Sequence, residues 1–261
     1  MKHRIFIVIS LIVFFCLIQG CNRAKVNLHE LSPEQQFDNA KSYFDRRNYH
    51  NAKFAFTYII MNNPGHPIIE KTMFFLAETH FMSREYILAI EEYERLIRQM
   101  PRSEFADHAR FKIGLSYYHL SPNYQLDQQY TKRAISEFQR FLDEYPQSPY
   151  RERAMEKIRR CRNKLAKKEF KTGELYRKMG HYPSAIISFK AVIDTYYDTP
   201  FIGPAHYWKG ECHRRMGSLE DAETAYLSYI NNHPNGDYID RARRRLEDVR
   251  ERLDEKIRSR S

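Results

Sequence analysis

The chain has 261 residues and a formal net charge of +10 at pH 7, from 43 Lys and Arg against 33 Asp and Glu. Hydrophobic residues make up 42% and charged residues 29%, which is typical of a globular protein and excludes a largely disordered chain. Only nine residues are glycine, which argues against an all-β fold and against glycine-rich phosphate-binding loops.

The N-terminus has the pattern of an export signal. Lys2 and Arg4 precede an apolar run from Ile5 to Ile18. This run is shorter than the roughly 20 apolar residues that a transmembrane helix needs. Its length and its basic flank are typical of the core of a secretory signal peptide. An uncleaved N-terminal anchor is the alternative.

The apolar run ends in IQGC at residues 18–21, which resembles a bacterial lipobox. The resemblance implies cleavage before Cys21 and lipidation of its thiol, and Asn22 resembles an outer-membrane address. We therefore expect residues 1–20 to be a lipoprotein signal peptide and residues 21–31 to be a lipidated tether. The positive charge would suit nucleic acid, an anionic lipid surface or an acidic protein, but export excludes nucleic acid.

Five segments after the tether repeat one pattern. Each has a small residue on a first helix, then an Ala on a second helix, and an aromatic residue four positions later on the same helical face. The Ala and aromatic residues are Ala52 and Phe56, Ala89 and Tyr93, Ala134 and Phe138, Ala185 and Phe189, and Ala222 and Tyr226. This spacing matches the tetratricopeptide repeat of about 34 residues. We expect the small residue to let the paired helices approach closely.

Three irregularities modify the array. Residues 121–128 form a polar insertion between the two helices of the third unit. Residues 149–179 predict one long helix that links units three and four, and residues 238–257 predict a charged capping helix. The fold class is therefore an all-α tetratricopeptide superhelix of about five helix pairs with a C-terminal capping helix. Units 1–3 are expected at residues 32–148; the long helix, units 4–5 and the cap follow at 149–261.

A second signature, Pro-x-Ser/Thr-x-aromatic, follows four of the helix pairs. We expect its Pro to end one helix, its Ser or Thr to cap the next helix, and its aromatic residue to pack at the start of that helix. Tyr197 replaces Pro in one copy, and Gly236 stands in place of Ser or Thr in the last copy. The copies are Pro101–Phe105, Pro146–Tyr150, Tyr197–Phe201 and Pro234–Tyr238.

The lipobox, the five units, the second signature, the insertion and the helical segment Cys161–Ala166 together resemble the BamD family. These are outer-membrane lipoproteins of the β-barrel assembly machinery, and the resemblance covers about Leu31 to Leu253. It implies a non-enzymatic subunit without a cofactor, anchored by lipid on the periplasmic face of the outer membrane. Its implied partners are a barrel-forming core subunit with periplasmic domains, unfolded outer-membrane proteins and other assembly lipoproteins.

A second hypothesis is a periplasmic adaptor that organises peptidoglycan or secretion complexes through the same repeats. An enzyme is a third, but no GxxxxGK[ST], GxGxxG, GxSxG or HExxH motif occurs. His206 and His213 are two turns apart on one helix, and we expect them to pack rather than to bind metal. Cys161 and Cys212 are expected to be separate buried thiols, with a disulfide as the alternative in an oxidising periplasm.

Resemblance to other tetratricopeptide proteins places the fifth and twelfth residues of each unit on the concave surface. In the first three units these residues are Phe37, Phe44, Phe74, Phe81, Phe111 and Tyr118. We expect them to form a substrate-binding groove, because exposed apolar patches usually mark interaction sites. The alternative is that neighbouring helices or the N-terminal segment bury these rings.

Basic residues of the C-terminal half supply a second candidate surface. We expect it to dock the barrel-forming partner, with ordinary solvated helix faces as the alternative. The candidate docking residues are Arg159, Arg160 and Lys167 on the long helix and Arg243 and Arg244 on the last helix.

Overall fold

The computed structural model describes residues 28–259, and every regular element in that range is helical. The elements are η1 (Leu28–Glu30), α2 (Pro33–Asp45), α3 (Tyr49–Asn62), α4 (Ile68–Met82), α5 (Tyr86–Gln99), α6 (Ala106–Leu120), α7 (Gln129–Glu144), α8 (Arg151–Lys178), α9 (Tyr182–Thr195), α10 (Ile202–Met216), α11 (Leu219–Asn232) and α12 (Ile239–Arg258). The all-α class that the sequence predicts is confirmed.

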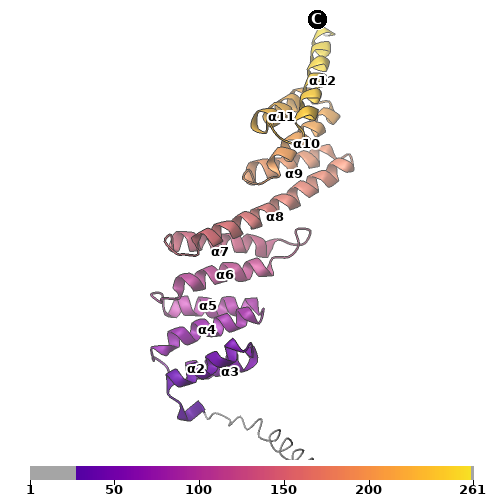
Figure 1. Ribbon diagram of the computed structural model, residues 1–261. Helices are drawn as coiled ribbons and strands as arrows, with labels where there is room; N and C mark the ends of the chain where they lie inside the picture. Colours follow the sequence, from indigo (N-terminus) through magenta and orange to yellow (C-terminus); the bar gives the residue numbers. More distant parts are fainter. Residues whose placement is uncertain (1–27, 260–261) are drawn as a thin grey trace, which may run out of the picture.

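The helices stack in chain order as five antiparallel pairs (Figure 1). Each pair consists of a first and a second helix: α2 and α3, α4 and α5, α6 and α7, α8 and α9, and α10 and α11. The last helix, α12, packs on α11 and lies at the opposite end of the stack from α2. A repeat array buries its core through contacts between neighbours and needs such a terminal cap. The predicted superhelix of five pairs with a capping helix is therefore correct.

The small residue of each first helix lies where the two helices of a pair touch. In three units this small residue is a glycine. A Cβ atom added to it would come within 2.7–2.9 Å of the aromatic ring that faces it on the second helix. Real Cβ atoms essentially never approach so closely, so the ring occupies the space that the glycine leaves. The three contacts are Gly114 with Phe138, Gly173 with Phe189, and Gly210 with Tyr226.

Helix α8 joins the two halves of the array. Its 28 residues span about 42 Å at 1.5 Å per residue. Ala154 and Cys161, in its N-terminal half, belong to the core of the third unit, whereas Phe170 belongs to the core of the fourth. The predicted long helix is confirmed, and it also serves as the first helix of the fourth pair.

The insertion between α6 and α7 is an ordered loop held by one buried side chain. Gln128 is 4% exposed, and its Nε2 donates hydrogen bonds to the carbonyl oxygens of Asn123 at 2.8 Å and Leu126 at 3.0 Å. Thr131 Oγ1 donates to Gln128 Oε1 at 2.7 Å. Because the buried amide is satisfied at both ends, it fixes the path of the loop.

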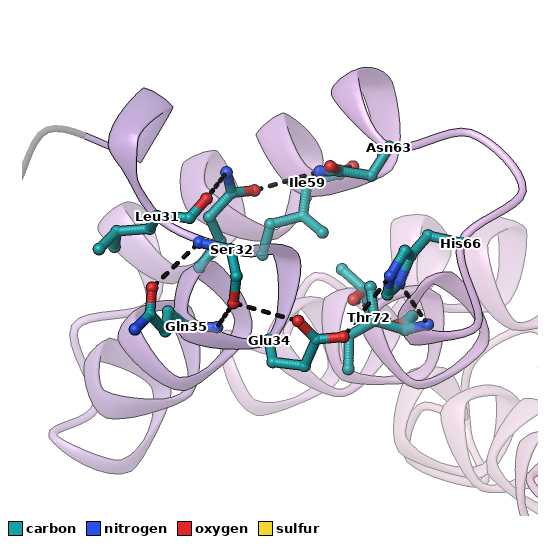
Figure 2. A network of polar contacts seen from close by, with 10 residues as sticks. Leu31, Ser32, Glu34, Gln35, Ile59, Asn63, His66 and Thr72 are labelled. Atoms are coloured by element: carbon teal, nitrogen blue, oxygen red, sulfur yellow. Dashed lines mark hydrogen bonds and ion pairs between the residues drawn. The ribbon is translucent and has the colours of Figure 1, made fainter.

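Polar contacts close the N-terminal end of the stack (Figure 2). Ser32 and Gln35 form a capping box: the Gln35 backbone N–H donates to Ser32 Oγ at 3.3 Å, and the Ser32 N–H donates to Gln35 Oε1 at 3.0 Å. Asn63 Nδ2 donates to Gln36 Oε1 at 3.1 Å and so ties the end of α3 to α2. These contacts fix the first pair where the tether would enter it.

Within residues 28–259, no helix combines the length and the apolar character needed to cross a membrane. Cys21, the expected signal peptide and most of the expected tether lie outside the described residues.

Candidate partner-binding surfaces

Three of the six expected groove residues belong to the core. Phe37, Phe74 and Phe111 are 3%, 5% and 0% exposed. For these rings the alternative interpretation holds, because neighbouring helices and loops bury them. The expectation that they line an open groove is corrected.

The ring that covers the fifth-position aromatic usually comes from the second signature. Phe105 stacks on Phe74 with ring centroids 4.6 Å apart, and Tyr150 stacks on Phe111 at 5.1 Å. The same contact recurs in the C-terminal half. There Phe201 lies 5.5 Å from Phe170, and Tyr238 lies 4.5 Å from Tyr207. The two sequence patterns are therefore two sides of one contact between repeats.

The Ser of the second signature also reaches back to the preceding repeat. Ser103 Oγ donates to Glu70 on α4 at 2.6 Å, and Ser148 Oγ donates to Asp107 on α6 at 2.7 Å. Neither serine is the N-cap residue of the next helix. The expected capping role is therefore wrong for these two copies, where the hydroxyl joins successive first helices.

The twelfth-position rings remain half-buried at one end of the first helices, and each lies under a lysine. Lys41 Nζ is 5.6 Å from the Phe44 ring centroid, and Lys112 Nζ is 4.3 Å from that of Phe81. Cations at such distances are attracted to the ring face. The candidate groove thus consists of partly exposed rings beneath ammonium groups.

The third of these rings, that of Tyr118, lies beside basic residues of α8. Lys157 Nζ lies 4.5 Å from the Tyr118 ring centroid. A hydrogen bond with Glu156, and after it a side-chain hydrogen bond with Tyr118, raise the pKa of Arg160. We name Phe44, Phe81 and Tyr118 the aromatic row, and the structure brings its end next to candidate docking residues.

The five expected docking residues are exposed, but they lie on two helices that pack against different neighbours. Arg159, Arg160 and Lys167 lie on α8, which packs on α6, α7 and α9. Arg243 and Arg244 lie on α12, which packs on α11. They form two separate candidate surfaces, an α8 surface and an α12 surface.

Two mostly buried carboxylates, which no sequence pattern indicated, follow the small residue of a first helix. Glu211 is 8% exposed and accepts a hydrogen bond from Tyr226 Oη at 2.6 Å, and the Arg214 and Arg245 guanidinium groups each lie 3.2 Å from it. Burial acts to raise the pKa of Glu211, but these donors outweigh it and lower that pKa below its ordinary value. Glu78 repeats the arrangement with Tyr93.

The remaining candidates are two cysteines and two histidines. Cys161 and Cys212 are free thiols buried in separate clusters, as the sequence predicts, and burial raises their pKa values to about 11 and about 12. His206 is half-buried, and burial followed by the nearby His233 lowers its pKa to about 4. His213 Nδ1 lies 3.6 Å from Asp221.

Five stacked antiparallel helix pairs, in which a small residue of the first helix faces an aromatic ring of the second, define a helical-repeat protein of the tetratricopeptide class. The family YfiO, described as outer membrane lipoprotein, matches residues 29–228. This chain belongs to that family, which confirms its resemblance to BamD proteins.

Two relatives and one solved structure align with most of this chain. Outer membrane protein assembly factor BamD of Caulobacter vibrioides is 26% identical over 229 residues, which cover 85% of this chain and 75% of the relative. The protein of the same name from Rickettsia prowazekii is 26% identical over 238 residues, which cover 90% of this chain and 94% of the relative. The TPR2AB domain of yeast Sti1, from a complex with pHSP90, is 15% identical with a TM-score of 0.45, covering 85% and 84%.

Proposed function

We propose that this chain takes part in the assembly of outer-membrane proteins as a non-enzymatic lipoprotein. It would scaffold the β-barrel assembly complex, dock on its barrel-forming subunit and receive unfolded outer-membrane proteins. The observation that carries the proposal is the match of nearly the whole repeat array, residues 29–228, to a family of outer membrane lipoproteins. The names of the relatives from Caulobacter vibrioides and Rickettsia prowazekii supply the process, outer membrane protein assembly.

The proposed attachment is a lipid on Cys21 after removal of residues 1–20, with residues 21–31 as the tether on the periplasmic face. Each buried methylene contributes about 0.8 kcal/mol, and two or more acyl chains on one residue would hold the protein permanently. The first helix pair follows this tether directly, and its capping box at Ser32 supports a fixed start for the array. Mass spectrometry of the mature N-terminus tests this attachment.

The proposed division of labour assigns unfolded clients to the aromatic row and the barrel-forming subunit to the α8 and α12 surfaces. Half-buried rings such as Phe44 and Phe81 offer apolar contact without a specific shape, which suits many clients. Exposed guanidinium groups such as Arg243 suit a carboxylate-bearing folded partner.

The direct test is co-purification of the tagged lipoprotein from detergent-solubilised outer membranes. We expect a β-barrel protein with periplasmic domains to be recovered in stoichiometric amount, with other lipoproteins beside it. Recovery of a peptidoglycan enzyme or a secretin without that barrel protein would contradict the proposal. That outcome would favour the periplasmic adaptor.

A further inference from the structure

A basic pocket lies between the insertion loop and α8. Its volume is about 590 Å³ and its wall includes Arg160, Lys164 and Lys167 from α8 and Tyr124 from the loop. Among the described residues that line it there are three cations and no carboxylate. A concave site lined by one sign of charge concentrates ions of the opposite sign.

The lysines of this pocket are held by groups that do not neutralise them. Lys164 Nζ donates to Ser121 Oγ at 2.6 Å and to the Pro122 carbonyl oxygen at 3.0 Å. Lys167 Nζ lies 4.6 Å from the centroid of the Tyr124 ring. Hydroxyl, carbonyl and ring contacts orient an ammonium group but leave its full charge in place.

Burial increases the need for a counter-charge at Lys164. Desolvation lowers the pKa of this lysine, and the contacts around it do not restore that pKa. A bound anion would stabilise the ammonium form directly. The loop that carries its acceptors is fixed by the buried Gln128, so the site is built before any ligand arrives.

The lining of the pocket also has an apolar part. It consists of Pro200 and Phe201, from the turn before α10, and Pro122 from the insertion loop. The pocket therefore offers both cations and apolar contact. That combination fits a side-chain carboxylate on a peptide whose neighbouring residues are apolar.

We propose that this pocket binds a carboxylate-bearing segment of an extended peptide from a partner protein. Arg160 pairs with Glu156 of its own helix, so Lys164 and Lys167 are the lining cations whose contacts within the described residues include no carboxylate. The inference rests on the proposed function for the source of the segment, a subunit of the assembly machinery. The binding site itself can be tested with a peptide alone.

A flat anionic membrane fits the same pocket less well. Helix α8 also carries Glu152, Glu156, Glu169 and Glu174. A membrane surface would meet these carboxylates together with the lysines, whereas a single side chain enters a pocket whose described lining contains no carboxylate. The charge pattern of α8 thus favours a peptide over a lipid headgroup.

The test uses the full detergent-solubilised lipoprotein and a fluorescein-labelled, C-terminally amidated decapeptide of alternating Asp and Leu. The matched probe has Asn in place of Asp. The pocket variant is Arg160→Gln with Lys167→Gln, which leaves the loop contacts of Lys164 in place. The control variant is Lys178→Gln with Lys190→Gln, which removes two exposed positive charges elsewhere.

We expect the Asp peptide to bind the unaltered protein about tenfold more tightly than the Asn peptide. The pocket variant should lose about tenfold in affinity for the Asp peptide, and the control variant should change by less than about twofold. A photo-crosslinking residue at Tyr124 should capture the Asp peptide, and one at the exposed Tyr197 should not. These results together would support the pocket.

Three results would overturn the proposal. Equal affinity for the two peptides would show that no carboxylate is recognised. An equal loss in the pocket and control variants would show attraction by net charge alone. Loss of binding to phosphatidylglycerol vesicles in the pocket variant, with peptide affinity unchanged, would assign the pocket to a lipid headgroup. Peptide binding together with failed co-purification of a barrel protein would overturn the proposed function and support the pocket.

Discussion

At the scale of single residues, the buried carboxylates are the least expected feature of the molecule. Glu211 and Glu78 occupy equivalent positions, and each accepts a hydrogen bond from the aromatic residue of the facing second helix. A buried carboxylate without partners would be strongly destabilising. Each tyrosine therefore fills the space beside the small residue and also satisfies a charge, which phenylalanine at the equivalent positions cannot do.

Tyr226→Phe should lower the free energy of unfolding by about 1–3 kcal/mol, because it removes a donor from a buried charged acceptor while keeping the ring. Tyr197→Phe removes a hydroxyl from an exposed ring and should have little effect. Chemical denaturation of both variants measures the difference. Equal stability of the two variants would show that Arg214 and Arg245 satisfy Glu211 without the hydroxyl of Tyr226.

His206 should make the protein less stable in mild acid. Burial, then His233 and Lys209, lower its pKa from 6.5 to about 4, and Asp194 opposes them only in part. The unfolded chain therefore binds more protons between those values, so stability is complete above pH 6.5 and falls as the pH drops toward 4. We expect His206→Phe to flatten the dependence of the melting temperature on pH in this range. If the melting temperature of the variant depends on pH as before, other groups cause that dependence.

At the scale of elements, the sequence predicts what local patterns determine. The long helix α8 follows from a segment without proline and with a single internal glycine, Gly173. The close contacts of the helix pairs follow from small and aromatic residues at fixed spacing. The small and aromatic residues recur in every unit, so their spacing alone determines the register of the helix pairs.

Contacts between successive repeats could not be predicted in the same way. Phe74 and Phe105 are both visible in the sequence, but only the fold shows that the second ring covers the first. The same limit applies to Glu211 and Tyr226, which meet across a helix pair. The sequence marks Tyr226 as a recurring residue, but it does not show that its hydroxyl meets Glu211.

Ala134→Trp tests the register of the third pair. Ala134 is fully buried between α6 and α7, and a larger side chain there should cost about 1–3 kcal/mol or more through overpacking. Ser136→Trp on the same helix places the same ring at an exposed position and serves as the control. Thermal melts should show a clear drop for the first variant only. A similar melting temperature for both would contradict the repeat register.

At the scale of the whole molecule, the proposed client site and the proposed α12 docking surface lie in different halves of the array, which α8 joins. The aromatic row spans the first three pairs, and the α12 surface lies at the opposite end of the stack (Figure 1). Their separation would let a client and a docked subunit be bound at the same time. The continuity between Tyr118 and the basic side chains of α8 provides the proposed junction.

Arg243→Glu with Arg244→Glu should weaken capture of the barrel-forming subunit, because two exposed cations at the proposed contact become anions. Lys132→Glu with Arg133→Glu reverses the charges of two consecutive exposed residues on α7 and is the matched control. Quantitative co-purification from solubilised membranes compares the two. Full recovery with the α12 variant would remove these arginines from the interface.

Phe44→Ala with Phe81→Ala should weaken the binding of peptides taken from the C-termini of outer-membrane barrels. Such segments expose alternating aromatic residues, and ring contacts are worth about 0.5–1.5 kcal/mol per pair beyond apolar burial. Phe44 contacts Phe75 and Phe81 contacts Tyr86, so the variant should also lose some stability, but less than a variant of the fully buried Phe56. Peptide titration and a thermal melt on the same sample separate these effects.

The matched control is Phe54→Ala with Ile87→Ala, which removes two exposed apolar side chains from the second helices α3 and α5. We expect its peptide affinity to equal that of the unaltered protein. Normal affinity in the Phe44 and Phe81 variant would exclude the aromatic row as the client site. A loss confined to that variant, with a melt that stays cooperative, would place client binding on the half-buried rings of the first helices, because the buried fifth-position rings remain intact in it.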